Sequence, residues 1–219
     1  MDVGHTVATP GATSARGVPE YRFNATLARD IVRALTAAGY RRTILVNDNG
    51  RIGSLAERAG VANRFHAAIY LAIHHDAVQP RYLETWTFEG RPLPFSDRFH
   101  GFSLFVSRRN RRAGASERFG RLLARELLRR GNSPSLHHAE PIPGEGRPLL
   151  DRALGLYQFD DLVVLHEASM PALLLEAGVI VNRDEEAALF DPSYRGRVVG
   201  AVVAAIGEFC SEADSRRSR

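Results

Sequence analysis

The stretch "AIYLAIHHDA" at residues 68–77 indicates a buried strand that ends in polar residues. Its run of apolar and β-branched residues is typical of a strand in a covered sheet, and the run stops at His74, His75 and Asp76. These side chains either close the strand or bind a ligand. A single histidine beside a strand is more often a hydrogen-bonded structural residue, so this stretch alone leaves both roles open.

Helices and strands alternate along the rest of the chain. Apolar residues recur at steps of three and four from Glu20 to Ala38, which predicts a helix with one buried face that stops at Gly39. Further elements are predicted in this order: a strand at 43–46, a helix from Ser54 with Glu57 completing a capping box, strands at 68–73 and 101–107, a helix at about 116–130, a strand at about 171–176, and helices near 184–190 and 193–210. The segments 79–100 and 131–155, rich in proline and glycine, are predicted as irregular loops. This order predicts a single-domain α/β fold with a mostly parallel central sheet flanked by helices.

Composition excludes several classes of protein. A chain of 219 residues with 44% hydrophobic and 25% charged residues is ordinary for a globular domain. One cysteine, Cys210, excludes an internal disulfide framework and a cysteine zinc cluster. No run reaches the roughly 20 apolar residues of a membrane span, and the N-terminus lacks the features of a signal peptide. The net charge of +4 favours a polyanionic neighbour, although the basic run at 107–112 is equally expected as solvated surface.

Ionisable residues gather at the predicted carboxyl ends of strands. His5 follows "DVG", His74 ends "AIYLAI" and Glu176 ends "ALLL". Ligands of open α/β sheets bind at that edge, and Glu20 reaches it if the loop before the first helix folds back. Two imidazoles and one carboxylate are a typical catalytic zinc set, and a further carboxylate can take a proton from water.

Simpler explanations exist for some of these residues. A carboxylate at a helix N-terminus, such as Glu20, is favoured by the helix dipole alone. Glu176 is harder to explain in this way, because a carboxylate inside "LLLEAGV" needs a metal or a cation as partner.

Five segments in order carry a family resemblance. They are "DVGH" at 2–5, "GVPEYRFN" at 17–24, "LAERAGVAN" at 55–63, "LAIHHDA" at 71–77 and "PALLLEAGVIVNRDEE" at 171–186. With these segments the sequence resembles the zinc-dependent N-acetylmuramoyl-L-alanine amidases of the bacterial cell wall, the Amidase_3 family. The last segment is the most specific, and the five together span nearly the whole chain.

The resemblance implies a role for each residue. His5, Glu20 and His74 are expected to bind one Zn²⁺ at the carboxyl edge of the strands, and Glu176 is expected to be the general base. His75 is expected to be a neighbour of the site. Zinc polarises a carbonyl and makes bound water acidic near pH 7, so Glu176 would pass the water proton to the departing amine without a covalent intermediate.

The resemblance also implies the biological setting. It suggests a catalytic domain at 1–210 and a polar basic tail at 211–219. The expected reaction is hydrolysis of the amide bond between N-acetylmuramic acid and L-alanine in peptidoglycan or muropeptides, during wall remodelling or autolysis. Nucleic acid is not expected as a partner, no activator protein is identified, and the expected location is the periplasm or the extracellular cell wall.

Some features depart from the family or leave alternatives. Only "MDV" precedes the expected first-strand glycine and histidine, where the family has a longer apolar strand. His137 and His138 are expected at the surface of the second loop rather than in a second metal site, and a blocking role for Glu140 or Glu145 is not favoured. Two other functions stay open: a zinc amidohydrolase of similar fold for a small N-acyl amino acid such as N-formylglutamate, and a catalytically silent wall-binding relative.

Overall fold

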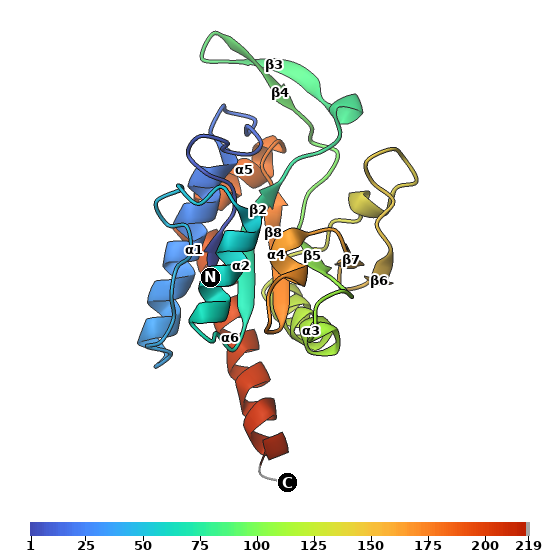
Figure 1. The fold of residues 1–219 in the computed structure, drawn as a ribbon. Helices are drawn as coiled ribbons and strands as arrows, with labels where there is room; N and C mark the ends of the chain where they lie inside the picture. Colours follow the sequence, from blue (N-terminus) through green and yellow to red (C-terminus); the bar gives the residue numbers. More distant parts are fainter. Residues whose placement is uncertain (218–219) are drawn as a thin grey trace.

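Six strands form the central sheet of the computed structural model, which describes residues 1–217 (Figure 1). In spatial order they are β1 (Asp2–Val3), β2 (Tyr70–Asp76), β8 (Ala172–Val179), β5 (Ser103–Val106), β7 (Leu156–Gln158) and β6 (Leu149–Asp151). Strands β1, β2 and β8 are parallel, and β5 and β7 are parallel to each other. Antiparallel pairing joins β5 to β8 and β6 to β7. The predicted α/β fold with a mostly parallel sheet is confirmed.

Helices cover both faces of this sheet (Figure 1). One face carries α1 (Glu20–Ala37), α3 (Ala113–Arg129) and α6 (Pro192–Arg217), and the other carries α2 (Leu55–Arg64) and α4 (Val163–His166). Successive residues of β2 alternate between the two cores: Leu71 and Ile73 belong to the larger core, Tyr70 and Ala72 to the smaller one. Burial on both faces explains why β2 and β8 are nearly continuous apolar runs.

The ends of the first two helices agree with the sequence signals. α1 begins at Glu20, and Gly39 follows its end with a φ of 96°. Ser54 caps α2 by accepting a hydrogen bond from the backbone N–H of Glu57. The predicted strand at 43–46 is wrong: only Val46 makes a bridge, to Asp2, because β1 is two residues long and offers little to pair with.

Both predicted loops contain regular structure that the sequence analysis missed. Residues 79–100 include a hairpin, β3 (Glu84–Phe88) and β4 (Arg91–Phe95), which projects beyond the sheet (Figure 1). Its turn uses positive φ angles at Glu89 and Gly90, and a two-stranded ribbon tolerates the prolines of β4 because no further strand pairs with it. The second loop, 131–155, includes a 3₁₀ turn at His137–Ala139 and the short strand β6.

The C-terminal part of the chain is helical. α5 (Arg183–Phe190) leads from β8 into α6, which continues past Cys210. Of the predicted tail at 211–219, residues 211–217 therefore belong to α6, and 218–219 lie outside the described residues. Within residues 1–217, no helix combines the length and the apolar character needed to cross a membrane.

Candidate metal centre

His5 lies just beyond β1, in a backbone conformation that its neighbours hold in place. Its φ is 64°, which is uncommon for a residue other than glycine. Its carbonyl oxygen accepts two hydrogen bonds of 2.6 Å, from Asn47 Nδ2 and from Arg58 Nη2. The same two residues also donate to the carbonyl of Val3, Asn47 through Nδ2 and Arg58 through Nη1. The turn after β1 is thus fixed by buried side chains from two other segments.

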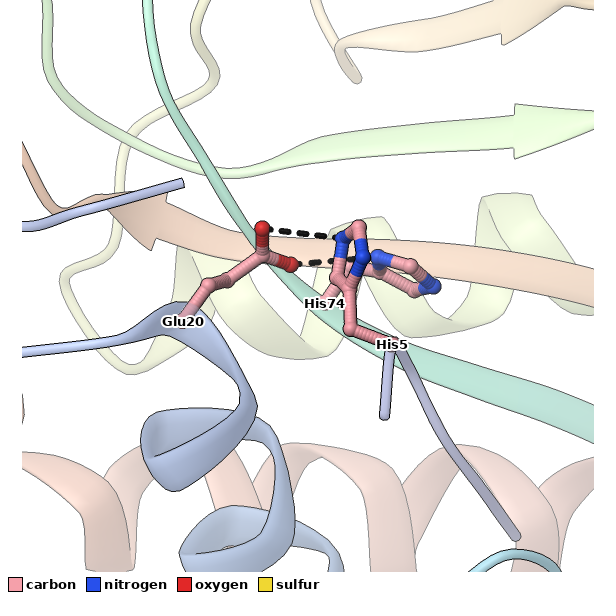
Figure 2. Close-up of side chains that lie close together, drawn as sticks. All are labelled: His5, Glu20 and His74. Atoms are coloured by element: carbon pink, nitrogen blue, oxygen red, sulfur yellow. Dashed lines mark hydrogen bonds and ion pairs between the residues drawn. The ribbon is translucent and has the colours of Figure 1, made fainter. Parts of the chain in front are cut away.

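Glu20 brings the two predicted histidine ligands together (Figure 2). Its Oε2 lies 3.0 Å from His5 Nε2, and its Oε1 lies 3.2 Å from His74 Nδ1. Asn24 Nδ2 donates to Oε1 at 3.0 Å, and the backbone N–H of Ala12 donates to Oε2 at 3.1 Å. The contact with Ala12 shows that the loop before α1 folds back towards Glu20, which is the condition under which the sequence places Glu20 at this edge.

The space around these three side chains suits a small ion. The ligand atoms of His5, Glu20 and His74 all lie within 4.8 Å of one another. A Cβ atom at Gly4 would lie 2.4 Å from the ring of His74, and one at Gly11 would lie 2.3 Å from Glu20 Oε2. The two glycines therefore leave room that any side chain would fill. Two imidazoles and a carboxylate are a donor set that zinc prefers, so the residues fit the expected metal.

The electrostatics of Glu20 also suit a ligand. Burial raises the pKa of this carboxyl group, but hydrogen bonds and charge from His5 and His74 lower it more, so the pKa ends well below its usual range. Glu20 is therefore ionised at neutral pH, as a metal-binding carboxylate must be.

Glu176 lies on β8, directly beside this cluster. It pairs in register with His74 of β2, and its buried Oε2 has no hydrogen-bond partner among residues 1–217. Burial, followed by the negative charges of Asp76 and Glu20, raises the pKa of Glu176 well above its usual value. The side chain also lines a cavity together with His138. Glu176 thus offers a buried carboxyl oxygen that is available to accept a hydrogen bond or a proton.

His75 lies outside the cluster, as the sequence analysis expected. It is 2% exposed, and burial lowers its pKa to about 3, so the ring is neutral. Its Nδ1 lies 2.8 Å from Asn24 Oδ1, and Asn24 in turn donates to Glu20. His75 therefore supports the carboxylate in two ways: its ring contacts Asn24, and its backbone N–H donates to Glu20 Oε1 at 3.3 Å.

A second cluster contains residues that the sequence analysis placed elsewhere. His137 is 3% exposed and His138 is largely buried, so the expectation that both lie at the surface is wrong. Both approach Asp76, the residue that ends β2. The sequence offered one signal for this cluster: Asp76, the third polar residue of "HHD", which lies two residues beyond the predicted ligand His74. The second loop has no periodic pattern that indicates that His137 and His138 return to the end of β2.

Comparisons with known proteins agree on one family. The family described as N-acetylmuramoyl-L-alanine amidase, Amidase_3, matches residues 1–208. A curated relative, the probable N-acetylmuramoyl-L-alanine amidase AmiB of Haemophilus influenzae, is 24% identical over 224 residues that cover 90% of this chain and 48% of the relative. The chain therefore spans about half the length of that relative.

Solved structures show the same fold. The crystal structure of the N-acetylmuramyl-L-alanine amidase Ami1 of Mycobacterium smegmatis superposes with a TM-score of 0.73 at 24% identity, covering 96% of this chain and 95% of the other. The catalytic domain of the amidase CwlV of Bacillus (Paenibacillus) polymyxa var. colistinus gives 0.69 at 22% identity, with 96% of both chains covered. Because the family match runs through nearly the whole chain, this protein belongs to the Amidase_3 family of N-acetylmuramoyl-L-alanine amidases.

Proposed function

We propose that the protein is a zinc-dependent hydrolase that cleaves the amide bond between N-acetylmuramic acid and L-alanine in peptidoglycan. The observation that carries this proposal is the convergence of His5, Glu20 and His74 next to the buried carboxyl group of Glu176. The family membership indicates the class of bond. Action in the periplasm or in the extracellular wall is part of the same proposal, because peptidoglycan lies there.

His5, Glu20 and His74 would hold the ion. When bound, Zn²⁺ would supply a Lewis acid that polarises the amide carbonyl and makes water acidic near neutral pH. The hydrogen bonds from Asn24 and from the backbone of Ala12 keep the Glu20 carboxylate oriented without changing its charge. Outer contacts of this kind fix the direction of a metal ligand before the ion arrives.

Glu176 would move the proton. Its unpartnered Oε2 can accept a proton from the attacking water and return it to the departing amine. The position of Glu176 on β8, in the middle of the sheet, keeps this oxygen in one place relative to His74 on β2. No serine or cysteine nucleophile is part of the proposal, and Cys210 lies in α6.

Digestion of purified peptidoglycan by the zinc-loaded protein tests this function. The products are read by mass spectrometry, and Glu176→Gln is compared with Glu208→Gln, which changes an exposed glutamate of α6. Release of stem peptides that begin with L-alanine is expected from the wild type and from Glu208→Gln. Glu176→Gln should be slower by roughly 10²–10⁴-fold, the usual contribution of a general acid or base.

Other outcomes would overturn the proposal in different ways. If peptidoglycan and soluble muropeptides both stay intact while an N-formyl amino acid is hydrolysed, the protein acts on a small substrate. If zinc is bound and none of these substrates is cut, the protein is a silent relative.

A further inference from the structure

A second cluster of potential metal ligands lies at the end of β2. The loop after α3 returns to this strand and brings His137 and His138 against Asp76. Asp76 Oδ2 is 2.6 Å from His138 Nε2 and 3.2 Å from His137 Nε2. All three ligand atoms lie within 4.8 Å of one another. None of these residues belongs to the His5–Glu20–His74 cluster.

The Nδ1 atom of each imidazole, which faces away from Asp76, already has a partner. His138 Nδ1 lies 2.9 Å from Glu145 Oε2, and His137 Nδ1 lies 2.8 Å from Ser135 Oγ. Glu145 is held in turn by Gln79 Nε2 at 2.8 Å. Histidines that bind metals typically use one nitrogen for the ion and the other for a carboxylate or another polar group. Both rings here therefore direct Nε2 towards the same carboxylate oxygen.

His137 shows that this cluster is not satisfied by its internal contacts. The residue is 3% exposed, and within residues 1–217 its buried Nε2 has no assigned hydrogen bond, only the ion-pair contact of 3.2 Å with Asp76 Oδ2. A buried polar atom without a partner costs free energy and needs an explanation. An ion between the two Nε2 atoms and the carboxylate would supply the partner that is missing.

We propose that Asp76, His137 and His138 bind a second divalent transition-metal ion, for which Zn²⁺ is a suitable occupant. Two imidazoles and one carboxylate form the same donor set as in the first cluster, and imidazole nitrogen favours this group of metals over magnesium or calcium. The proposal does not depend on the substrate or on the reaction, since it concerns only this chain and the ion.

An ion at this position would affect the cavity beside Glu176. His138 and Glu145 line the same cavity as Glu176. The ion would join the loop at 131–148 to β2 and would fix one wall of that cavity. In the absence of an ion, the contact of His138 with Asp76 and the hydrogen bond from Gln79 to Glu145 still join this loop to β2 and to the segment that follows β2.

Metal content distinguishes these two states. The protein is treated with chelator, reloaded with Zn²⁺, desalted and measured by elemental mass spectrometry. We expect two ions per chain in the wild type and one in both His138→Gln and His74→Gln. His166→Gln is the matched control, because its ring pairs with Glu167 and belongs to neither cluster, and this variant should retain two ions. One ion in the wild type that is unchanged in His138→Gln would overturn the proposal.

A measurement on the unaltered protein guards against variants that fail to fold. An anomalous difference map from wild-type crystals grown with Zn²⁺ should show one peak beside His74 and a second beside His137. A peak beside His74 with none beside His137 would overturn the second site and leave the proposed function intact. Zinc at both positions in a protein that does not cut peptidoglycan would support the second site and contradict the proposed function.

Discussion

Replacing Arg58 by methionine is expected to weaken zinc binding at the His5–Glu20–His74 cluster, although its guanidinium group contacts only the backbone of one ligand. Arg58 is 2% exposed and donates to the carbonyl oxygens of Ile52 at 2.8 Å, Val3 at 2.9 Å and His5 at 2.6 Å. Methionine fills part of the same volume but donates no hydrogen bond. The His5 carbonyl would then keep the hydrogen bond from Asn47 Nδ2 but lose the one from Arg58.

The expected loss can be worked out from these contacts. A hydrogen bond from a charged group contributes roughly 1.5–3 kcal/mol, and Arg58 makes three to backbone oxygens. Arg58 also lies 3.8 Å from the buried carboxylate of Asp2, and removing one partner of a buried pair typically costs about 3–5 kcal/mol. Because Asp2 can take up a proton when Arg58 is absent, the loss of this pair adds little. The lower end of the range for the three hydrogen bonds then gives an expected fall in the free energy of unfolding of about 4.5 kcal/mol.

Zinc affinity should fall less than stability. Loss of an outer contact to a metal ligand typically lowers affinity by roughly 10–100-fold. That range corresponds to about 1.4–2.8 kcal/mol of binding free energy. The remaining bonds from Asn47 should keep the change near the lower end.

Two measurements check this reasoning. Urea unfolding of the chelated protein gives the stability, and competition with a chelator in a His138→Gln background gives the zinc affinity of the first cluster alone. Arg64→Met is the control, because Arg64 lies on the same helix and is exposed. If Arg58→Met lowers stability but leaves zinc affinity within twofold of the control, the claim that Arg58 holds His5 for the metal is refuted.

Three further predictions concern the surroundings of the site. Gly11→Ala should remove zinc from the first cluster, because the new Cβ would lie 2.3 Å from Glu20 Oε2 and the φ of 80° costs alanine roughly 1–2 kcal/mol. Unchanged zinc content in this variant would show that the loop can move aside. Glu186→Ala should lower the free energy of unfolding by about 2–3 kcal/mol, because this buried carboxylate binds Arg16 at 2.6 Å. This loss is below the usual range for a buried ion pair because Arg16 is partly exposed. A loss under about 0.5 kcal/mol in urea unfolding would contradict the prediction. Burial raises the pKa of Glu185 to about 7, against 4.5 for the unfolded chain, so its contribution to stability is complete below about pH 4.5 and is lost as the pH rises through 7. The stability of the wild type relative to Glu185→Gln should therefore fall between about pH 5 and pH 8. A difference that stays constant over this range would count against the raised pKa.

The sequence predicted best those elements whose residues are covered on both sides. The strands around His74 and Glu176 are continuous apolar runs because helices pack on both faces of the sheet. The helix from Ser54 was predicted from its cap, which depends only on residues close in the chain. Local signals of this kind do not depend on where distant segments lie.

The errors concern elements that depend on their partners. Residues 43–46 have strand-like composition, yet they pair only where β1 is present, so a two-residue neighbour leaves them mostly irregular. The hairpin of residues 84–95 shows the opposite error. Its prolines argue against an interior strand, but they are compatible with a ribbon of two strands that projects from the sheet.

The two clusters differ in predictability for the same reason. His74 follows the last apolar residue of its strand and Glu20 begins α1, so each is marked by a local pattern, and the loop before α1 folds back to bring them together. His137 carries no such mark, because its partner Asp76 is reached only through the return of a long loop. Since His74 and Asp76 both belong to β2, the two clusters share this strand as their support. A change in the position of β2 should therefore disturb both clusters together, whereas a change in the loop should disturb only the second.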